Sequence, residues 1–332
     1  MPPARVAING LGRIGRAALK IIQEQPDLEL VAVNDLTAPD GLAYLLKYDT
    51  VYGRYEKEVR QEAGQLVVGG HAIRALQERA PEKLPWGDLG VELVFECTGV
   101  FTARSDLEKH LQAGARRVIL SAPGKGEELV TVVHGVNQAE DAQIVSCASC
   151  TTNCITPVIE VFGRRIGLHK AIMTTIHAYT ASQALVDGPS SKWRSGRAAA
   201  VNFVPASTGA AQATTKALPQ YQGKFDGVAI RGPVAVGSLA DITILAARAT
   251  SVEEINQIFQ EEAESERYRG VLGVVSDPIV SSDIIKDPHG SLFDLTMTQV
   301  VDGDLVKVMS WYDNEWGYAS QMVREGAQLL KR

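Results

Sequence analysis

The sequence predicts an α/β protein of two domains, the first with a mostly parallel sheet and the second with a mixed or antiparallel sheet. Its 332 residues fit two domains of roughly 150 residues each. Short apolar segments alternate with helical patterns as far as Cys150, whereas longer strand-like segments dominate the rest of the chain. Hydrophobic residues make up 45% of the chain, which is enough for a large core and excludes a mainly disordered protein.

Charge, hydropathy and cysteine usage exclude several other classes of protein. No apolar run approaches the length of about 18 residues that a membrane-spanning helix needs. The formal charge of −6 gives no global attraction to nucleic acid or to an anionic membrane, so neither is expected as a primary partner. The N-terminus enters a strand pattern at once, so we expect no secretory signal. Four cysteines are too few for a disulfide framework in a chain of this length, which indicates a reducing, cytoplasmic setting.

The first part of the chain contains five apolar segments short enough to be buried strands. They lie at residues 6–8, 30–33, 93–95, 117–120 and 144–145. Amphipathic helical patterns occur between them, as at residues 16–25 and 107–113. Strands joined by helices form right-handed crossovers, so the predicted sheet is parallel and covered on both faces. Residues 61–76 differ, because Gly69 and Gly70 separate two alternating stretches and predict a hairpin.

After Cys150 the predicted strands are longer and helices are fewer. The strand-like stretches lie at residues 170–179, 228–231, 238–247 and 305–311. Helices are predicted at residues 252–264 and 316–330. The sequence contains no repeat, low-complexity tract or Pro/Ser-rich linker, so the two domains should follow one another directly.

A glycine-rich segment follows the first predicted strand and opens the first predicted helix. Gly10, Gly12 and Gly15 have the G-x-G-x-x-G spacing, which permits a tight turn and lets a pyrophosphate approach the backbone at a helix N-terminus. Asp35 ends the second strand, 20 residues beyond Gly15. A carboxylate there can accept both hydroxyls of an adenosine ribose and repels a 2′-phosphate, which favours NAD over NADP. The alternative is an ordinary glycine turn followed by a solvated aspartate.

Three cysteines, Cys147, Cys150 and Cys154, lie within eight residues. Cys150 precedes an apolar segment with a helical pattern at residues 155–162, which places it at a helix N-terminus. The helix dipole and free N–H groups there favour thiolate over thiol and predict a lowered thiol pKa, and they could also bind an oxyanion. The alternative is a group of buried, inert cysteines. We expect no metal site, because no second Cys or His cluster has suitable spacing.

A cysteine nucleophile needs a base, and His177 is the candidate among the six histidines. It lies in a predicted strand at residues 172–180 and close to the hydroxyl of Thr180. The sequence does not show its distance from Cys150. A histidine in a strand can equally be a structural residue that is held by hydrogen bonds.

Two further segments have the chemistry of an anion site. The STGAA segment at residues 207–211 supplies hydroxyls and a flexible backbone just before a helical pattern, which suits a phosphate or a sulfate. Arg231 ends a predicted strand, where its guanidinium can pair with a phosphate. The alternatives are an ordinary helix cap for the first segment and a solvated arginine for the second.

Eight segments match one known family in order along practically the whole chain. They are GLGRIGR at 10–16, ND at 34–35, SAP at 121–123, SCTTNC at 149–154, TTIHAYTASQ at 174–183, DGP at 187–189, ASTGAA at 206–211 and WYDNEWGY at 311–318. The last segment is long enough that a chance match is hard to obtain. On these residues the sequence resembles the phosphorylating glyceraldehyde-3-phosphate dehydrogenases.

The resemblance implies a fold, an assembly and a reaction. Residues 1–149 and 315–332 would form a Rossmann-type, mostly parallel NAD-binding domain, and residues 150–314 an α+β catalytic domain with a mixed or antiparallel sheet. The protein would be a cytoplasmic homotetramer in glycolysis or gluconeogenesis. It would oxidise glyceraldehyde 3-phosphate with NAD and inorganic phosphate to 1,3-bisphosphoglycerate.

The resemblance also assigns roles to single residues. Cys150 would attack the aldehyde to give a thiohemiacetal, and His177 would act as general base and assist hydride transfer to NAD, leaving a thioester that inorganic phosphate cleaves. The residues that would bind NAD are Gly10, Gly12, Arg13, Ile14, Asp35, Arg79, Ser121 and Asn314. Thr180 and Arg231 would bind the substrate phosphate. The residues that would bind the attacking phosphate are Ser149, Thr151, Thr208 and Gly209.

The sequence departs from the family pattern at a few positions. Cys97 replaces a serine that is usual before Thr98 and Gly99. Ser195 follows Arg194 where bacterial relatives often have a second arginine, so we expect an altered affinity for phosphate rather than lost activity.

Three alternative functions remain at this point. Erythrose-4-phosphate dehydrogenase oxidises an aldehyde without phosphorolysis, but the intact STGAA segment at 207–211 speaks against it. Aspartate-semialdehyde dehydrogenase has a similar Cys/His pair but would not explain the segments at 174–180 and 311–318. The presence of both Cys150 and His177, with the negative net charge, disfavours a catalytically silent NAD-binding sensor or an RNA-associated protein.

Overall fold

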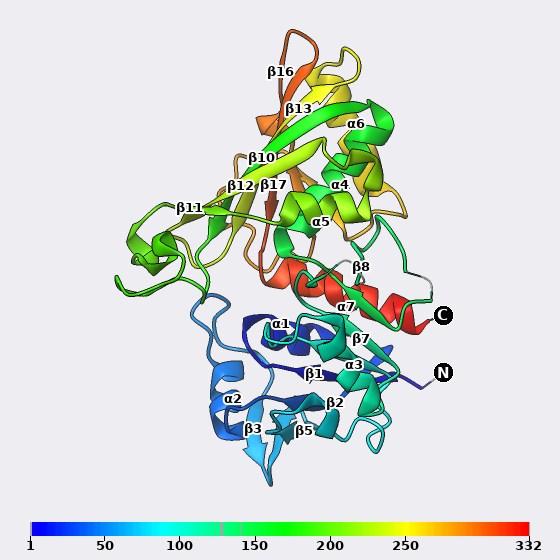
Figure 1. The fold of residues 1–332 in the computed structure, drawn as a ribbon, viewed down its shortest axis with the longest axis vertical. Helices are drawn as coiled ribbons and strands as arrows, with labels where there is room; N and C mark the ends of the chain where they lie inside the picture. Colours follow the sequence, from blue (N-terminus) through cyan, green and yellow to red (C-terminus); the bar gives the residue numbers. More distant parts are fainter. Residues whose placement is uncertain (1, 127–128, 140, 332) are drawn as a thin grey trace. The chain divides into compact units, whose positions relative to one another are not determined.

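The computed structural model describes residues 2–126, 129–139 and 141–331. The chain divides into two compact units, each with its own sheet (Figure 1). Unit 1 comprises Met1–Val132, Ala139–Ala148 and Met322–Arg332, and unit 2 comprises Val133–Gln138 and Ser149–Gln321. Among the helices of the described residues, none is both long enough and apolar enough to cross a membrane.

Unit 1 is built on a nine-stranded sheet whose strands run from blue to green in Figure 1. In spatial order they are β3 (Val59–Glu62), β4 (Gln65–Val68), β5 (His71–Leu76), β2 (Leu28–Asn34), β1 (Ala4–Asn9), β6 (Leu93–Glu96), β7 (Arg117–Leu120), β9 (Ile144–Ser146) and β8 (Val130–Thr131). All pairs from β5 to β8 are parallel. The order β5-β2-β1-β6-β7-β9 is that of a doubly wound dinucleotide-binding sheet. The predicted mostly parallel sheet is therefore confirmed.

In unit 1 the predicted strands match the structure, whereas one of the helices was not predicted. Each of the five predicted strands lies within an observed strand, and the predicted hairpin is the antiparallel meander β3-β4-β5. The helices are α1 (Arg13–Ile22), α2 (Pro39–Lys47), α3 (Arg104–Gln112) and the C-terminal α7 (Trp316–Leu330), which begins in unit 2. Helix α2 was not predicted. Its Tyr44 and Leu45 are 62% and 40% exposed, so its apolar residues are not confined to its buried face.

Unit 2 is built on a mixed sheet of eight strands, as predicted. In spatial order they are β11 (Val204–Ser207), β12 (Phe225–Gly232), β10 (Leu168–Ala178), β13 (Ser238–Ala246), β17 (Leu305–Tyr312), β15 (Ser291–Asp294) and β14 (Leu272–Val275), with β16 (Gln299–Val301) also paired to β17. Strand β10 pairs in parallel with β12 and antiparallel with β13. The helices of this unit are α4 (Cys150–Arg165), α5 (Ala210–Ala217) and α6 (Val252–Glu264).

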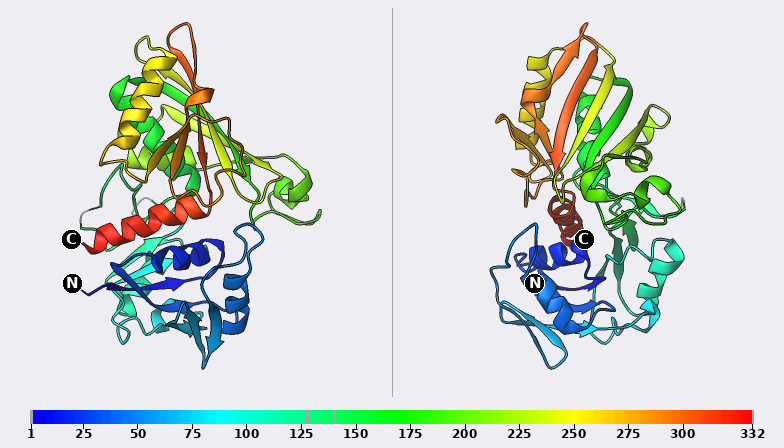
Figure 2. Two further views of the ribbon diagram at one scale, coloured as in Figure 1. Left: turned by 180° about the vertical axis from the view of Figure 1, so that it is seen from behind. Right: turned by 90° about the vertical axis from the view of Figure 1, so that its left-hand side faces the viewer.

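The side chains of the long strand β10 alternate between a buried face and an exposed face of this sheet. Its Met173 and His177 are buried, whereas Ile172 and Ile176 alternate with them and are 62% and 36% exposed. Helices α4 and α6 pack on the buried face, and their apolar side chains join one core with those of the sheet (Figure 2). This packing turns His177 toward the helix that begins at Cys150.

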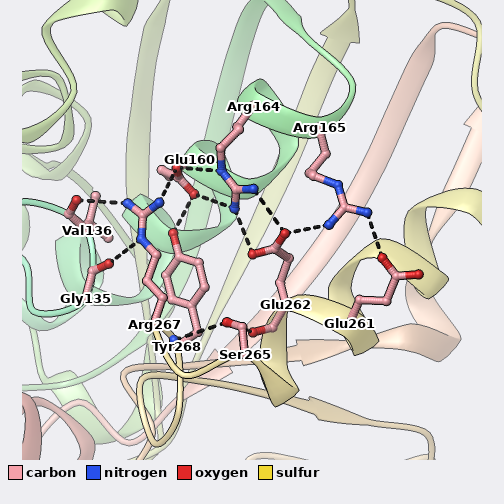
Figure 3. Close-up of polar contacts among 10 residues, drawn as sticks. All are labelled: Gly135, Val136, Glu160, Arg164, Arg165, Glu261, Glu262, Ser265, Arg267 and Tyr268. Carbon is pink, nitrogen blue, oxygen red and sulfur yellow. Dashed lines mark hydrogen bonds and ion pairs between the residues drawn. The ribbon is translucent and has the colours of Figure 1, made fainter.

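Helix α4 is also anchored by an ion-pair network that begins at the buried Glu160 (Figure 3). Glu160 Oε1 accepts hydrogen bonds from Arg164 Nε at 2.9 Å and from Arg267 Nη1 at 3.0 Å. Its Oε2 accepts one from the hydroxyl of the buried Tyr268 at 2.5 Å. Arg164 continues the network to Glu262 of α6, at 2.7 Å. The network therefore joins the C-terminal half of α4 to α6 and to the segment that follows it.

Candidate active site

A pocket of about 460 Å³ lies at the carboxyl ends of strands β1, β2 and β6 in unit 1. Ligands of open α/β sheets bind at this end of the strands. Its lining residues are Asn9, Gly10, Gly12, Asn34, Asp35, Leu36, Glu78, Arg79, Cys97, Thr98, Val100 and Phe101. The pocket therefore brings together four of the predicted cofactor residues, Gly10, Gly12, Asp35 and Arg79.

Gly10, Gly12 and Gly15 of the G-x-G-x-x-G segment differ in what a larger side chain would contact at each position. Gly10 has φ +91°, and a Cβ there would lie 2.6 Å from the backbone nitrogen of Thr98. A Cβ on Gly15 would collide with the carbonyl oxygen of Gly10. A Cβ on Gly12 would meet no protein atom within 4 Å, although Gly12 lines the pocket and is the N-cap of α1. The space at Gly12 and the helix N-terminus beside it fit the pyrophosphate of a dinucleotide.

The Asp35 carboxylate accepts hydrogen bonds from two backbone N–H groups, of which that of Leu11 belongs to the glycine loop. Its Oδ2 accepts from Leu11 N at 2.7 Å and its Oδ1 from Thr37 N at 2.8 Å. Arg13 begins α1, but its guanidinium pairs with Asp49 at 2.5 Å and does not line the pocket. The side chain of Arg13 is therefore engaged with Asp49 and not with the pocket.

A buried carboxylate below this pocket was not predicted. Glu96 is fully buried, and its Oε2 accepts from Asn9 Nδ2 at 2.6 Å and from His110 Nε2 at 3.0 Å. Its Oε1 accepts from the N–H of Thr98 at 2.8 Å and from the hydroxyl of Thr98 at 2.5 Å. Trp86 Nε1 donates to His110 Nδ1 at 3.0 Å, which leaves the proton of this imidazole on Nε2. Glu96 therefore fixes Asn9 and Thr98, two residues of the pocket wall.

Like Arg13 and Ile14, the predicted cofactor residues Ser121 and Asn314 lie outside the lining of this pocket. Ser121 follows β7, and its N–H donates to the Glu96 carbonyl at 2.9 Å. Asn314 belongs to unit 2, where it is buried. Its Oδ1 accepts from Gly237 N at 3.1 Å and from the Ser238 hydroxyl at 3.0 Å, which fixes the orientation of the side-chain amide.

In unit 2 the predicted nucleophile and the predicted base are in contact. Helix α4 begins at Cys150, as predicted, and Ser149 caps it by accepting a hydrogen bond from Thr152 N at 3.1 Å. Cys150 Sγ lies 3.3 Å from His177 Nε2, although the two residues are 27 positions apart in the sequence. The geometry suits transfer of a proton between thiol and imidazole.

The second nitrogen of His177 has two close neighbours. His177 Nδ1 lies 2.7 Å from the carbonyl oxygen of Ala178 and 2.5 Å from Arg231 Nη1. The same Arg231 Nη1 donates to the Ala178 carbonyl at 3.2 Å. Arg231 and His177 are partners in the parallel register of β12 and β10, so their side chains lie on the same face of the sheet.

Tyr312 supports this pair from the end of β17. Its ring meets the His177 ring edge-on, with centroids 5.9 Å apart. Its hydroxyl is 2.9 Å from Thr151 Oγ1 and 2.7 Å from Thr175 Oγ1. Tyr312 belongs to the WYDNEWGY segment, but no role was predicted for it. Thr151 is the residue that the resemblance assigns to the attacking phosphate. Its hydroxyl is buried and faces Tyr312.

Burial is the largest cause of the pKa shifts of Cys150 and His177. It raises the pKa of the Cys150 thiol to about 11, although the charge of Arg231 and the hydrogen bonds of Thr151 oppose the shift. Burial and then the charge of Arg231 lower the pKa of His177 to about 4. The lowered thiol pKa that the helix N-terminus predicts is therefore wrong, because desolvation of the thiolate outweighs the helix dipole.

The other cysteines have different environments. Burial raises the pKa of Cys97 and that of Cys154 to about 12. Cys154 lies one turn beyond Cys150 in α4, and its Sγ donates to the Ser310 carbonyl at 3.7 Å. Throughout residues 2–126, 129–139 and 141–331, no three His, Cys, Asp or Glu side chains are grouped as ligands of a metal ion.

A second, more polar pocket of about 700 Å³ lies in unit 2; we call it the cationic pocket. Its lining residues are Ser182, Gln183, Ser190, Ser191, Lys192, Trp193, Arg194, Ser195, Pro205, Ala206, Ser207 and Arg231. Lys192, Arg194 and Arg231 give it three positive charges, which suits an anion such as a phosphate. Arg231 lies both in the lining of this pocket and against His177.

The remaining predicted phosphate residues lie outside the lining of the cationic pocket. Thr180 Oγ1 is 2.8 Å from the hydroxyl of Ser182, which does line it. Thr208 Oγ1 accepts from Ala210 N at 3.2 Å, and Gly209 is the N-cap of α5. Ser149 caps α4 beside Cys150. Of the six residues predicted to bind phosphate, Arg231 thus lines the cationic pocket and the other five do not.

Comparisons with known proteins find matches in both units of the chain. Residues 4–104 match the NAD binding domain of glyceraldehyde 3-phosphate dehydrogenase, and residues 149–314 match the C-terminal domain of the same family. The chain is 50% identical over 329 residues to glyceraldehyde-3-phosphate dehydrogenase of Mycobacterium bovis, with 96% of each chain covered. It is 46% identical over 336 residues to that of Clostridium acetobutylicum, with 99% of each covered. It is also 46% identical over 324 residues to glyceraldehyde-3-phosphate dehydrogenase 2 of Streptomyces avermitilis, with 96% of each covered.

These matches span both units and confirm the resemblance and the NAD cofactor that the sequence segments predict. The chain belongs to the glyceraldehyde-3-phosphate dehydrogenase family.

Proposed function

We propose that this protein catalyses the NAD-dependent oxidation and phosphorylation of glyceraldehyde 3-phosphate to 1,3-bisphosphoglycerate, in glycolysis or gluconeogenesis. The observation that carries the proposal is the 3.3 Å contact between Cys150 Sγ and His177 Nε2 at the N-terminus of α4. Arg231 connects this pair to the cationic pocket. A thiol with a neighbouring base suits attack on an aldehyde, and a group of cations suits the phosphate of the same substrate.

In the proposed mechanism, Cys150 Sγ attacks the aldehyde carbon while its proton passes to His177 Nε2, which gives a thiohemiacetal. The N–H groups at the start of α4 stabilise the oxyanion that forms. When bound, NAD supplies the hydride acceptor that the oxidation requires. The acyl group then remains on Cys150 as a thioester, and inorganic phosphate cleaves it to release the acyl phosphate and restore the thiol.

The proposal divides the chain into an NAD-binding domain of residues 1–149 and 315–332 and a catalytic domain of residues 150–314. The backbone of Gly10, Gly12, Arg13 and Ile14 receives the pyrophosphate, and Asp35 receives the adenosine ribose. The other residues proposed to bind NAD are Arg79, Ser121 and Asn314, the last through the nicotinamide carboxamide. Thr180 and Arg231 bind the substrate phosphate. The residues proposed for the attacking phosphate are Ser149, Thr151, Thr208 and Gly209.

The experiment that tests this function is NADH formation from glyceraldehyde 3-phosphate with and without inorganic phosphate. Steady turnover that requires phosphate would support the proposal. Turnover that ignores phosphate would mean that water cleaves the thioester. The alternative reading, an erythrose-4-phosphate dehydrogenase, would then be preferred, and erythrose 4-phosphate is the matched substrate to assay beside the first.

The cofactor preference gives a first prediction, for Asp35→Asn. The variant keeps an oxygen that can accept from Leu11 N or Thr37 N but loses the charge that repels a 2′-phosphate. Because a like charge beside a phosphate costs several kcal/mol, we expect kcat/KM with NADP to rise by about tenfold or more. Steady-state kinetics with NAD and with NADP measure the change. Asp40→Asn is the matched control, since Asp40 is exposed in the first turn of α2. An unchanged use of NADP in Asp35→Asn would contradict the role of this carboxylate.

The proposed homotetramer rests on the exposed face of the sheet in unit 2. Ile172 and Ile176 of β10 and Val228 of β12 are exposed there, and Phe203, just before β11, is 72% exposed. Val228 pairs with Thr174 in the parallel register, so it lies on the same face as the two isoleucines. An apolar face of this kind indicates a protein interface. We propose that a second copy of the chain covers it.

Ile172→Glu tests this interface. A charge on the covered face would have to lose its hydration in the assembly, so the variant should fall from a tetramer to dimers or monomers of the 35.7 kDa chain. Light scattering coupled to size-exclusion chromatography gives the mass. Val301→Glu on β16, also an exposed apolar position, should leave the mass unchanged. A wild-type protein that is monomeric at every concentration would refute the proposal.

A cytoplasmic location completes the proposal. All four cysteines are free thiols, and a catalytic thiol stays reduced in a reducing compartment. The net charge of −6 gives no reason to add nucleic acid or membrane as a primary partner.

A further inference from the structure

The side-chain amide of Asn314 is held by its oxygen. Asn314 Oδ1 lies 3.1 Å from Gly237 N, and a backbone N–H can only donate, so the amide atom at this place must be the oxygen. The hydroxyl of Ser238 donates to the same oxygen at 3.0 Å. Within the part of the chain that the structure describes, no group accepts a hydrogen bond from Asn314 Nδ2. Both hydrogens of this nitrogen are therefore available to a ligand.

The hydroxyl of Ser238 has its single proton directed at Asn314. Ser238 begins β13 and is 1% exposed. Its Oγ accepts from the backbone N–H of Ala178 at 3.1 Å. Since a backbone N–H is always the donor, the one proton of the hydroxyl goes to Asn314 Oδ1. The Ala178 contact therefore fixes the direction in which Ser238 donates.

The backbone beside Ser238 favours the same orientation of the amide. Gly237 has φ +89°, and a Cβ there would lie 2.3 Å from the Ser281 carbonyl oxygen, so this position requires glycine. In this conformation its N–H donates to Asn314 Oδ1. A half-turn of the Asn314 amide would set its NH2 group against two donors, those of Gly237 and Ser238. The two neighbouring residues together exclude that orientation.

We propose that Ser238 is a positioning residue for NAD, which fixes the Asn314 amide so that Nδ2 donates to the carbonyl oxygen of the nicotinamide carboxamide. This inference rests on the proposed contact of Asn314 with that carboxamide. A carboxamide presents an oxygen that accepts and an NH2 group that donates. A donating Asn314 therefore selects the oxygen and disfavours the opposite orientation of the carboxamide.

Ser238 also connects Asn314 to the strand end that carries His177. Ala178 ends β10, and its N–H donates to Ser238 Oγ while its carbonyl oxygen lies 2.7 Å from His177 Nδ1. All four residues of this chain of contacts are buried and belong to unit 2. The proposed base and the proposed nicotinamide donor thus share one buried support within a single unit.

The experiment compares the binding of NAD and of ADP-ribose to full-length Ser238→Ala by isothermal titration calorimetry. ADP-ribose lacks the nicotinamide, so the ratio of the two dissociation constants isolates the contact that Asn314 makes. We expect the variant to bind NAD about fivefold more weakly, which is the effect of one net hydrogen bond. Its binding of ADP-ribose should not change. Equal losses for the two ligands would overturn the proposal, because they would show a general disturbance of the fold.

A double-mutant cycle with Asn314→Ala tests whether Ser238 acts through Asn314. Asn314→Ala should itself weaken the binding of NAD but not that of ADP-ribose. Adding Ser238→Ala to it should cost no further NAD affinity, because the amide that the hydroxyl orients is already absent. Losses that add in the double variant, or an Asn314→Ala protein with unchanged NAD binding, would contradict the proposal.

Ser310→Ala is the matched control. Ser310 is a fully buried serine of the neighbouring strand β17, and its hydroxyl contacts Ser291 at 2.8 Å rather than Asn314. The same loss of a buried hydroxyl from the same sheet should leave the ratio of the NAD and ADP-ribose dissociation constants unchanged. A shift of this ratio as large as that in Ser238→Ala would refute a specific role of Ser238.

The orientation of the amide is tested with 3-acetylpyridine adenine dinucleotide, which keeps the carbonyl oxygen of the carboxamide but has a methyl group in place of its NH2. Ser238→Ala should lose as much affinity for this analogue as for NAD. A loss for NAD alone would place the contact at the NH2 group and would overturn the assigned orientation.

Should Ser238→Ala fail to fold, Ser238→Cys carries the same comparison, because a thiol of similar size is a weaker donor. It should show the same selective loss of NAD affinity, and NAD affinity equal to that of the wild type would overturn the proposal. All binding measurements are made without glyceraldehyde 3-phosphate or inorganic phosphate. A failure of phosphate-dependent NADH formation would therefore count against the proposed function, whereas the binding ratios decide the role of Ser238.

Discussion

Cys150→Ser is expected to lower phosphate-dependent NADH formation by about four orders of magnitude, as loss of a nucleophile does in other enzymes with covalent intermediates. The serine hydroxyl would occupy the same place at the start of α4 and face the same His177 Nε2. It cannot replace the sulfur, because a hydroxyl is far less acidic than a thiol and gives an ester that phosphate cleaves less readily. Steady-state assays at saturating NAD and phosphate measure the loss.

Cys154→Ser is the matched control for this prediction. Cys154 lies in the same helix and is buried, but its Sγ donates to the Ser310 carbonyl rather than to a histidine. A serine hydroxyl can make the same hydrogen bond, so turnover should stay close to that of the wild type. Comparable losses in the two variants would contradict the prediction, because the loss in Cys150→Ser would then come from a disturbed helix and not from removal of the nucleophile.

The second large effect is expected from Glu160→Ala, which removes the centre of the network in Figure 3. The hydroxyl of Tyr268 would lose its acceptor in a buried site, and Arg164 and Arg267 would lose a carboxylate. The two arginine side chains are 40% and 41% exposed, so water offsets part of their loss. We expect a loss of about 2–3 kcal/mol in the free energy of unfolding. Thermal unfolding should show it as a Tm lower by several degrees.

Glu261→Ala provides the comparison for this stability effect. Glu261 also pairs with an arginine of α4, Arg165, but both partners are at the surface, where an ion pair adds little. Its Tm should stay near that of the wild type. If the two variants lost the same stability, burial of the Glu160 carboxylate would not be what anchors α4.

The sequence predicted the parallel strands of unit 1 well, because such strands are buried on both faces and appear as short continuous apolar runs. The helices over 252–264 and 316–330 match α6 and α7 to the residue. Helix α2 escaped prediction because it is only nine residues long and carries the exposed apolar residues Tyr44 and Leu45 beside its buried face. The short strands β8, β11, β14, β15 and β16 were missed too, because runs of two to four residues give little periodicity in the sequence.

The candidate site was predictable by residue type but not by arrangement. Cys150 and His177 could be chosen for their chemistry, whereas their contact depends on how β10 packs against α4. Glu96 and Tyr312 stayed hidden for a related reason. Each acts through hydrogen bonds to residues from other strands and helices, and a single carboxylate or phenol in an apolar segment does not show its partners. The direction of the Cys150 pKa shift was predicted wrongly, because the position of a residue in a helix is easier to predict from a sequence than its burial.

The parallel pairing of His177 with Arg231 limits how the two strands can change in length during evolution. Side chains alternate along a strand, so an insertion or deletion of one residue within β10 or β12 would turn one of the two side chains to the opposite face of the sheet. The contact between histidine and arginine would then be lost without any substitution of either residue. We therefore expect length differences among homologous chains to fall in the connections outside these strands, whereas variation within them should be limited to substitutions.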